Sequence, residues 1–409
     1  MIQKIINIGA VATWSETEQS VVTQENVELQ ITDGIITDIA AEVMNAEEAI
    51  DVDGALITPG FIDPHTHPVF AGHRANEFKL RVAGRTYEEI AAQGGGIITS
   101  IQGVRNTDID ELFQQTQVRL DAFLLHGTTT IEAKSGYGLD MESELKSLRV
   151  LRNLIGETPL DIVPTFLGAH AFPPEYASNH EAYVDLICNE MIPAVAEEEL
   201  AEYCDVFCEK GYFTVDQSRR ILETALKYSL KPRMHADEFI DSGAAELAGE
   251  LGAISADHLM AVSPAGIKAL ADNNVIATLL PGTTLFLGKT EYADGRRLID
   301  SGVEVALATD FNPGSCTLTN MPVVMSLATL YCGLTVEEAF KAATYSAARA
   351  VARERFLGCI APGYQADLII WNLSGLSEIP YWLGSDNILA IMKKGELIER
   401  RLESRYSGI

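Results

Sequence analysis

The sequence predicts an α/β protein, a (β/α)8 barrel of the TIM type with a small β-sandwich domain built from both ends of the chain. Three observations predict this fold. From about residue 58 short β-branched runs alternate with longer helical patterns, eight such runs can be counted, and both ends of the chain are rich in strand patterns. The 409 residues are too many for one simple core and suit one large domain beside a smaller one.

The eight predicted barrel strands are short, and several are apolar on both faces, as expected of a parallel sheet covered by helices. They are ITPGFID (57–63), GTTTIEA (127–133), LDIVPTFL (160–167), CDVFC (204–208), LKPRMH (230–235), AISAD (253–257), NVIATLL (274–280) and VEVALAT (303–309). Helical patterns separate most of them. Residues 108–126 carry apolar side chains at helical spacing, and residues 335–352 open with Thr335 and Glu338, the two ends of a capping box.

The two ends of the chain contain shorter strand patterns with turns between them. Residues 1–57 include NVELQITDGIITDIA, in which Asp33-Gly34 is a hairpin signal, and residues 359–409 include ADLIIWN and AIMKKGELIER. We therefore expect these two segments to form one small β-sandwich domain together. Residues 58–358 are expected to form the barrel.

The composition excludes several kinds of partner. The formal net charge is −28, from 30 basic and 58 acidic side chains, and no basic stripe of the kind that nucleic acid requires is present. No apolar run approaches the roughly 20 residues of a membrane span, and the first residues lack the pattern of a secretion signal. We expect a cytoplasmic protein without nucleic-acid or membrane partners, in which an anionic ligand needs a local cationic pocket.

The stretch FIDPHTHPVF (61–70) places His65 and His67 one residue apart at the end of the first predicted barrel strand. Side chains two residues apart in a strand point to the same side. At the carboxyl end of a barrel strand that side is the barrel mouth, where two imidazoles can bind one metal ion at about 2.1 Å each. Pro64 and Pro68 restrict the backbone and help to fix this geometry.

Further polar residues end other predicted strands. A histidine pair alone is weak evidence, since such pairs are often surface or core residues. However, His170 lies at the end of the third strand, His235 and Glu238 at the end of the fifth, His258 at that of the sixth and Asp310 at that of the eighth. Because barrel enzymes carry their active sites at this end of the strands, the pattern favours a metal-dependent enzyme.

The chain resembles the amidohydrolase superfamily in PGFIDPHTH on the first strand, the histidines of the fifth and sixth strands and the aspartate of the eighth. Within that superfamily the resemblance to the imidazolonepropionase family covers nearly the whole chain. The stretches that carry it are FAGHRANEF (70–78), YEEIAAQGGGIITSI (87–101), IEAKSGYGLD (131–140), PTFLGAHAFP (164–173), HADEF (235–239), SADHL (255–259) and TDFNPGS (309–315). The superfamily motif is moderately specific, whereas its combination with GGGI, KSGYGL and TDFNPGS is highly specific.

The resemblance implies one divalent metal ion per chain, Zn²⁺ or Fe²⁺, with four protein ligands. These ligands are His65, His67, His235 and Asp310. Three nitrogens and one oxygen leave room for water, which distinguishes a catalytic site from a closed structural one. The resemblance further implies that Glu238 is the general base and acid, that His258 stabilises the developing oxyanion or orients the water, and that Asp310 can assist the proton transfer.

The implied reaction is hydrolysis of the cyclic amide C–N bond of 4-imidazolone-5-propanoate to N-formimidoyl-L-glutamate in histidine breakdown, with metal-activated water as the nucleophile. Six residues match family positions that contact substrate or product. They are Arg74, Tyr137, His170, Asn312, Gly314 and Ser315. A propionate carboxylate favours an arginine fork, so Arg74 is its expected partner. The family also suggests a homodimer.

Other functions stay open at this point. A deaminase of a nitrogenous ring such as guanine shares the HxH pair, the later His-x-x-Glu and the final aspartate, although a neutral base needs no cationic pocket. A binuclear enzyme of the hydantoinase type needs a carboxylated lysine, and Lys210 lies near the end of the fourth strand. A non-catalytic relative is a third alternative, although such relatives typically lose metal ligands.

Several site residues also have simpler interpretations. Arg74 could form a surface ion pair with Glu77, which would contribute little stability. Tyr137 could complete a turn, and His170 could be a buried structural histidine. The glycines at 94–96 lack the Lys-Ser/Thr of a phosphate-binding loop, so we expect them in a loop that covers the substrate.

Overall fold

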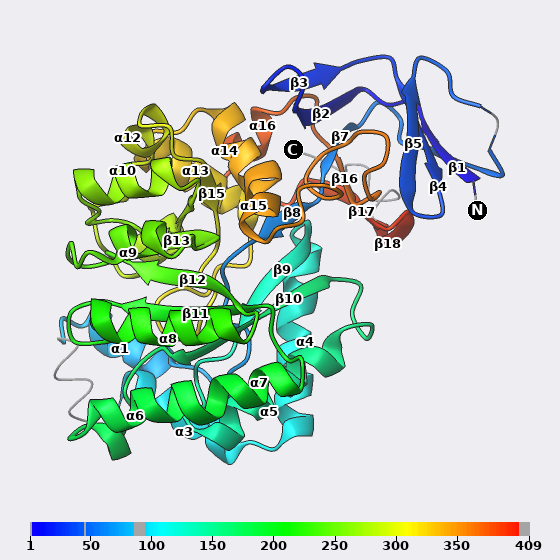
Figure 1. Cartoon of the computed structure of the whole chain (residues 1–409). Coiled ribbons are helices and arrows are strands. Elements are labelled where there is room, and N and C mark those ends of the chain that lie inside the picture. The colour runs from blue at the N-terminus through cyan, green and yellow to red at the C-terminus, as the bar shows by residue number, and fades with distance from the viewer. Residues whose placement is uncertain (1, 45, 86–94, 401–409) are drawn as a thin grey trace.

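The computed structural model describes residues 2–44, 46–85 and 95–400 and contains one large parallel sheet and two smaller sheets (Figure 1). Each predicted barrel strand is present, in chain order around the large sheet. The strands are β8 (Phe61–Asp63), β9 (Thr128–Lys134), β10 (Asp161–Ala169), β11 (Tyr203–Cys208), β12 (Lys231–Ala236), β13 (Ser255–His258), β14 (Ile276–Leu279) and β15 (Val305–Leu307). Neighbouring strands pair in parallel, so the predicted α/β barrel is confirmed.

The first and last strands meet beyond their ends and close the barrel. The backbone N–H of His67 donates to the carbonyl of Phe311 at 2.8 Å, and that of Asp310 donates to the carbonyl of His65 at 3.2 Å. The closure therefore runs through the residues that follow β8 and β15. It brings Asp310 to His65 and His67, although more than 240 positions separate it from either histidine in the sequence.

Helices cover the outside of the barrel and fill the connections between its strands (Figure 1). The larger of them are α1 (Ala75–Val82), α3 (Ile97–Asn106), α4 (Ile109–Leu125), α5 (Met141–Leu154), α8 (Val215–Lys227), α10 (Pro264–Asp272), α13 (Met321–Tyr331) and α14 (Val336–Ala343). The shorter ones are η1 (Pro174–Tyr176), α6 (His180–Leu186), η2 (Ile187–Met191), α7 (Ile192–Glu197), α9 (Ala244–Glu250), α11 (Pro281–Phe286), α12 (Gly295–Asp300), α15 (Tyr345–Ala350) and α16 (Glu378–Tyr381). None of the described helices is long and apolar enough to cross a bilayer.

The helical pattern predicted over residues 335–352 forms two helices instead of one. The predicted capping box of Thr335 and Glu338 is confirmed at the start of α14. At Thr344 the backbone leaves the helical region, with φ −125° and ψ −90°, and α15 begins. The hydroxyl of Thr344 donates to the carbonyl of Phe340 at 2.8 Å, a local bond that competes with helical continuation.

The small sheets draw strands from both ends of the chain. One sheet has the order β5 (Ile35–Ala40), β4 (Glu28–Thr32), β1 (Ile2–Ile6) and β6 (Glu48–Asp51). The other has the order β18 (Glu396–Arg400), β17 (Ile388–Lys393), β16 (Leu368–Trp371), β7 (Leu56–Pro59), β2 (Ala10–Ser15) and β3 (Ser20–Gln24). Strand β16 pairs antiparallel with β7, which joins the two ends directly.

The predicted hairpin at Asp33-Gly34 is confirmed. These two residues connect β4 and β5 with φ values of 49° and 80°, the positive values that a type I′ turn requires. The division into residues 1–57 plus 359–409 and residues 58–358 stays a prediction. The boundary itself falls inside β7.

The predicted first strand, 57–63, is wrong in one respect, because it forms two strands that belong to different sheets. Residue Gly60 separates β7, in the small sheet, from β8, in the barrel. A Cβ at Gly60 would lie 2.4 Å from the side chain of Thr129, so only glycine allows the chain to pass this close to β9.

Candidate active site

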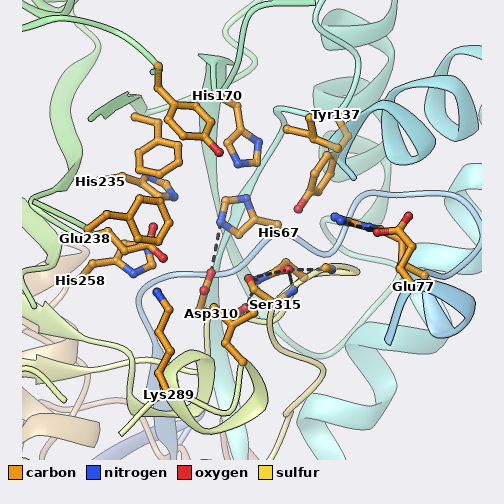
Figure 2. A pocket seen from close by; sticks show the side chains of 18 of the residues that line it. His67, Glu77, Tyr137, His170, His235, Glu238, His258, Lys289, Asp310 and Ser315 are labelled. Atoms are coloured by element: carbon orange, nitrogen blue, oxygen red, sulfur yellow. Dashed lines mark hydrogen bonds and ion pairs between the residues drawn. The ribbon is translucent and has the colours of Figure 1, made fainter. Parts of the chain in front are cut away.

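A cavity of about 600 Å³ opens at the carboxyl ends of the barrel strands (Figure 2). Its lining includes every predicted site residue except His65, which is fully buried beside His67. Figure 2 shows His235, Glu238 and His258 on one side of the cavity and Tyr137 on the other, with His67 between them. Of the glycines at 94–96 expected in a covering loop, Gly94 lies outside the described residues, and Gly96 directly precedes α3.

The predicted metal ligands converge with spacings that suit one ion. The Nε2 atoms of His65 and His67 are 3.3 Å apart, and Oδ1 of Asp310 lies 3.6 Å from the first and 3.4 Å from the second. Ligands bound tetrahedrally at 2.0–2.1 Å are about 3.3 Å from one another. The His235 ring centroid lies 4.5 Å from that of His65. These side chains can therefore hold a divalent cation.

Two buried carboxylates fix the tautomers of two of these histidines. Nδ1 of His65 lies 2.6 Å from Asp257, and Nδ1 of His235 lies 3.1 Å from Asp205. Because an ionised carboxylate only accepts hydrogen bonds, each Nδ1 donates to its carboxylate, and in the neutral form of each ring Nε2 keeps its lone pair. Against the effect of burial, the Asp205 carboxylate raises the pKa of His235, a shift that a bound cation would oppose. Burial and the nearby Lys134 cation lower the pKa of His65 well below its usual value, so the ring is neutral.

The carboxylate of Asp310 is also oriented by a hydrogen bond from a neighbouring side chain. The hydroxyl of Thr283 donates to Oδ2 of Asp310 at 2.5 Å, which leaves Oδ1 facing the two histidines. Asp310 has φ 53° and His258 has φ 80°, backbone conformations that residues other than glycine rarely adopt. Such strain is typical of functional sites, where surrounding contacts impose it. His258 ends β13, and Asp310 follows β15 after two intervening residues.

Glu238 and His258 form the acid–base side of the cavity. Nε2 of His258 lies 3.8 Å from Oε2 of Glu238. Burial, reinforced by the negative charge of Asp310, raises the pKa of Glu238 to about 8. A cation bound beside Asp310 would oppose this shift. Burial also lowers the pKa of His258 to about 3, so its imidazole is neutral.

The opposite wall of the cavity carries Arg74. Its guanidinium forms an ion pair with Glu77, 2.7 Å from Nη2 to Oε2, as the simpler interpretation expected, but not at the outer surface. The pair nevertheless lies in the cavity wall, and Arg74 is only 14% exposed. A Cβ on Gly314 would lie 2.2 Å from Nη1 of Arg74, so glycine at this position makes room for the guanidinium.

Tyr137 and His170 lie beside each other above His67. The ring of His170 stacks on that of His67 with centroids 5.2 Å apart, and Tyr137 is also 5.2 Å from His170. Nδ1 of His170 donates to the carbonyl of Gly136 at 2.9 Å, which leaves Nε2 as an acceptor. Burial raises the pKa of Tyr137, so its hydroxyl remains a hydrogen-bond donor.

The predicted substrate contacts after β15 shape a turn. The side-chain oxygen of Asn312 accepts hydrogen bonds from the backbone N–H groups of Gly314 and Ser315 at 2.8 and 2.7 Å. Its amide donates to the carbonyl of Asp310 at 2.7 Å. Asn312 lines the cavity, but these bonds use most of its hydrogen-bonding capacity. Its geometry suits holding the turn that supports Asp310 and presents Ser315.

Sequence reasoning missed several buried carboxylates that hold the site loops. Glu144 accepts hydrogen bonds from the backbone N–H groups of Gly136, Gly138 and Leu139, around Tyr137. Glu209 accepts from that of Phe239 at 2.8 Å, next to Glu238. Glu144 lies in the first turn of α5, where acidic residues are common, and Glu209 directly follows β11, so neither stands out in the sequence as a buried charge.

Sequence reasoning also missed two cations of the cavity. Arg81 donates to the carbonyl of Gly314 at 3.3 Å, and the Lys289 ammonium lies 4.5 Å over the ring of Phe239. Both line the cavity, which therefore has the cationic character that an acidic chain needs for an anionic ligand. Lys210, considered for a binuclear site, is exposed in a turn and is not part of the cavity lining.

Comparison with known proteins matches the chain to one family over most of its length. The family model described as "Amidohydrolase family" matches residues 56–398. The imidazolonepropionase of Geobacillus kaustophilus is 50% identical over 358 residues, which cover 88% of this chain and 84% of that protein. The imidazolonepropionase of Clostridium tetani is 45% identical over 384 residues, covering 92% and 91%.

Solved structures share the fold at much lower identity. A 5-methylcytosine deaminase from Klebsiella pneumoniae liganded with 5-fluorocytosine superposes with a TM-score of 0.76 at 17% identity, covering 99% of this chain and 98% of that one. The guanine deaminase from C. acetobutylicum with bound guanine gives 0.73 at 16% identity, covering 98% and 100%. Identities this low show the shared fold alone.

Proposed function

The chain belongs to the amidohydrolase family and, within it, to the imidazolonepropionases, and from this we propose that it hydrolyses 4-imidazolone-5-propanoate to N-formimidoyl-L-glutamate in histidine degradation. The observation that carries the proposal is one cavity with a metal-donor set on one side and a guanidinium on the other. A cyclic amide with a carboxylate tail needs both features.

We propose that His65, His67, His235 and Asp310 hold one divalent cation, Zn²⁺ or Fe²⁺. Nitrogen and carboxylate donors suit both metals, and metal availability often decides which is bound. When bound, the cation lowers the pKa of water from about 15.7 towards neutrality, so that hydroxide is available as a nucleophile. The carboxylates behind His65 and His235 keep the donor nitrogens directed at the cation.

Glu238 carries the proton in this proposal. It is positioned on the cavity wall, near His258 and within the electrostatic influence of Asp310. As a carboxylate it accepts a proton from the attacking water, and it then donates this proton to the ring nitrogen while the amide C–N bond breaks. His258 donates a hydrogen bond to the oxygen of the attacked carbonyl, which gains negative charge. Asp310 can assist the proton transfer.

Arg74 binds the propionate carboxylate, with Tyr137 and His170 beside it. The guanidinium is fixed by Glu77 on one side and rests against Gly314 on the other. Nε2 of His170 can accept a ring N–H of the substrate, and the Tyr137 hydroxyl can donate. Asn312 and Ser315 complete this side of the pocket. The deaminase alternative is not favoured, because a neutral base has no partner for Arg74.

The test combines elemental analysis with an ultraviolet assay. Protein treated with a chelator should lose activity towards 4-imidazolone-5-propanoate and regain it with one equivalent of Zn²⁺ or Fe²⁺ per chain. Guanine serves as the competing substrate and should not be deaminated. Metal-loaded protein that deaminates guanine and leaves the imidazolone intact would contradict the proposal, and two metal ions per chain would favour a binuclear site instead.

We also propose a homodimer that works in the cytoplasm, as the family suggests. Light scattering of the purified chain should give twice the mass of 44.5 kDa. A monomer mass across the micromolar range would contradict the assembly, and fractionation of cells tests the compartment.

A further inference from the structure

Five fully buried charged side chains lie directly behind the metal ligands, although none of them lines the cavity. They are Glu132, Lys134, Asp205, Arg233 and Asp257. The Lys134 ammonium lies 2.7 Å from Oε1 of Glu132 and 2.9 Å from Oδ2 of Asp205. Arg233 lies 4.0 Å from Glu132 and 3.7 Å from Asp257. Glu132 is therefore the link between the two cations of the cluster.

The cluster touches the metal ligands through their side chains. Asp257 holds Nδ1 of His65, and Asp205 holds Nδ1 of His235. Each of these carboxylates is paired with one of the two cations that Glu132 connects. The orientation of the His65 and His235 rings thus depends on the positions of Arg233 and Lys134.

The cluster also holds the backbone that carries the histidine pair. Oε2 of Glu132 accepts a hydrogen bond from the backbone N–H of Thr66 at 3.2 Å, and its own carbonyl accepts one from the Thr66 hydroxyl at 2.6 Å. The backbone N–H of Lys134 donates to the carbonyl of Thr66 at 3.0 Å. Thr66 lies between the ligands His65 and His67, so Glu132 fixes the segment from which both extend.

The composition of the cluster suits a cation at the site. The cluster has three carboxyl groups and two cationic side chains, and Asp310 adds a further carboxyl group at the cavity. In an interior of low polarity, removing one carboxylate leaves a cation unpaired and weakens the attraction for a further cation. Glu132 contributes to this balance and to the geometry at the same time.

We propose that Glu132 is a positioning residue of the metal centre, which fixes Thr66 between two ligands and balances Lys134 and Arg233 beneath the ligand carboxylates. The inference depends on the proposed metal site. Glu132 makes no contact with the cavity, so it acts through His65, His67 and His235 and not on the substrate.

The test compares Glu132→Gln with a matched control. Asp367 also binds a buried lysine, Lys393 at 2.6 Å, and accepts a backbone N–H, from Lys394 at 3.0 Å, but it lies in the small sheet region. Glu132→Gln should weaken Zn²⁺ affinity about 10–100-fold in competition with a chromophoric chelator, the range for residues that support metal ligands. Asp367→Asn should leave Zn²⁺ affinity unchanged.

Two further readouts separate positioning from a general loss of structure. In Glu132→Gln the visible spectrum of the Co²⁺-loaded protein should change and kcat should fall at saturating Zn²⁺, with KM unchanged because Arg74 is untouched. If Glu132→Gln does not fold, Glu132→Asp replaces it, since it keeps the charge but shortens the reach to Thr66, and should lose less affinity.

The outcomes are distinct. Wild-type affinity and an unaltered Co²⁺ spectrum in a folded Glu132 variant would overturn the inference, as would an equal loss of affinity in Asp367→Asn. A wild-type protein that binds no metal would instead overturn the proposed function, before either variant is compared.

Discussion

The two ends of the barrel each contain a buried lysine between two carboxylates, and the two clusters have different surroundings. At the carboxyl ends of the strands Lys134 pairs with Glu132 and Asp205. At the amino end of β10, Lys393 pairs with Asp161 at 2.7 Å and with Asp367 at 2.6 Å. The first cluster contacts histidines that face a cavity, whereas the second joins a barrel strand to the small sheet.

The comparison shows that a buried ion cluster does not define its own role. Both clusters satisfy charges that would be costly alone. What differs is the next contact: imidazole rings with free nitrogens at one end, and strands β16 and β17 at the other. In barrel enzymes the carboxyl end of the strands serves catalysis and the opposite end serves stability. Variants at the two ends should therefore separate activity from stability.

The largest expected effect is a loss of turnover from a change at the carboxyl ends of the barrel strands. Glu238→Gln removes the group proposed to carry the proton, so kcat should fall about 10²–10⁴-fold while metal content and thermal stability stay unchanged. The ultraviolet assay and elemental analysis measure this. Asp161→Asn, a carboxylate change at the opposite end, should keep kcat. Normal turnover in Glu238→Gln would remove this residue from the mechanism.

The next largest effect is a loss of folding stability from a change at the opposite end of the barrel, where Lys393 lies. Lys393→Met leaves Asp367 buried without its cation, and removing one partner of a buried pair typically costs about 3–5 kcal/mol in the free energy of unfolding. Denaturant titration measures the loss. The kcat/KM of the protein that remains folded should match the wild type. A selective loss of kcat/KM at unchanged stability would show that the two ends are not independent.

A smaller effect is expected at the cationic wall. Arg74→Ala removes a charge-assisted hydrogen bond to the carboxylate, so KM should rise about 10–100-fold, from the roughly 1.5–3 kcal/mol of such a bond. The kcat should stay within a few-fold. Arg296→Ala is the control, since its pair with Glu338 lies on the outer surface. An unchanged KM in Arg74→Ala would show that the carboxylate binds elsewhere.

The smallest effect concerns the glycine beside that arginine. In Gly314→Ala the new Cβ displaces the Arg74 guanidinium, and KM should rise a few-fold because a flexible side chain can adjust. Gly375→Ala, at a position with open space and an ordinary backbone, should change nothing. A Gly314→Ala enzyme with wild-type KM would mean that the position of Arg74 in the wall is not required.

Local patterns were sufficient to predict most of the fold. The eight barrel strands, the capping box at Thr335 and the hairpin at Asp33-Gly34 depend on short-range preferences, so the sequence predicts them directly. The division of the predicted first strand at Gly60 and the break between α14 and α15 at Thr344 were not predicted. The first depends on a close approach to a distant residue, Thr129, and the second accompanies a local hydrogen bond from Thr344 to Phe340 that no periodicity signals.

The sequence by itself determined which side chains the barrel mouth receives. Strand ends in a parallel barrel meet at one rim, so His65, His67, His235, Glu238 and Asp310 converge whatever surrounds them. Only the tertiary structure decided what supports them: Glu132 behind Thr66, Asp205 and Asp257 behind the rings, and Gly314 against Arg74. The physical reason is that a buried charge finds its partner across strands, at separations that periodicity along the chain does not encode.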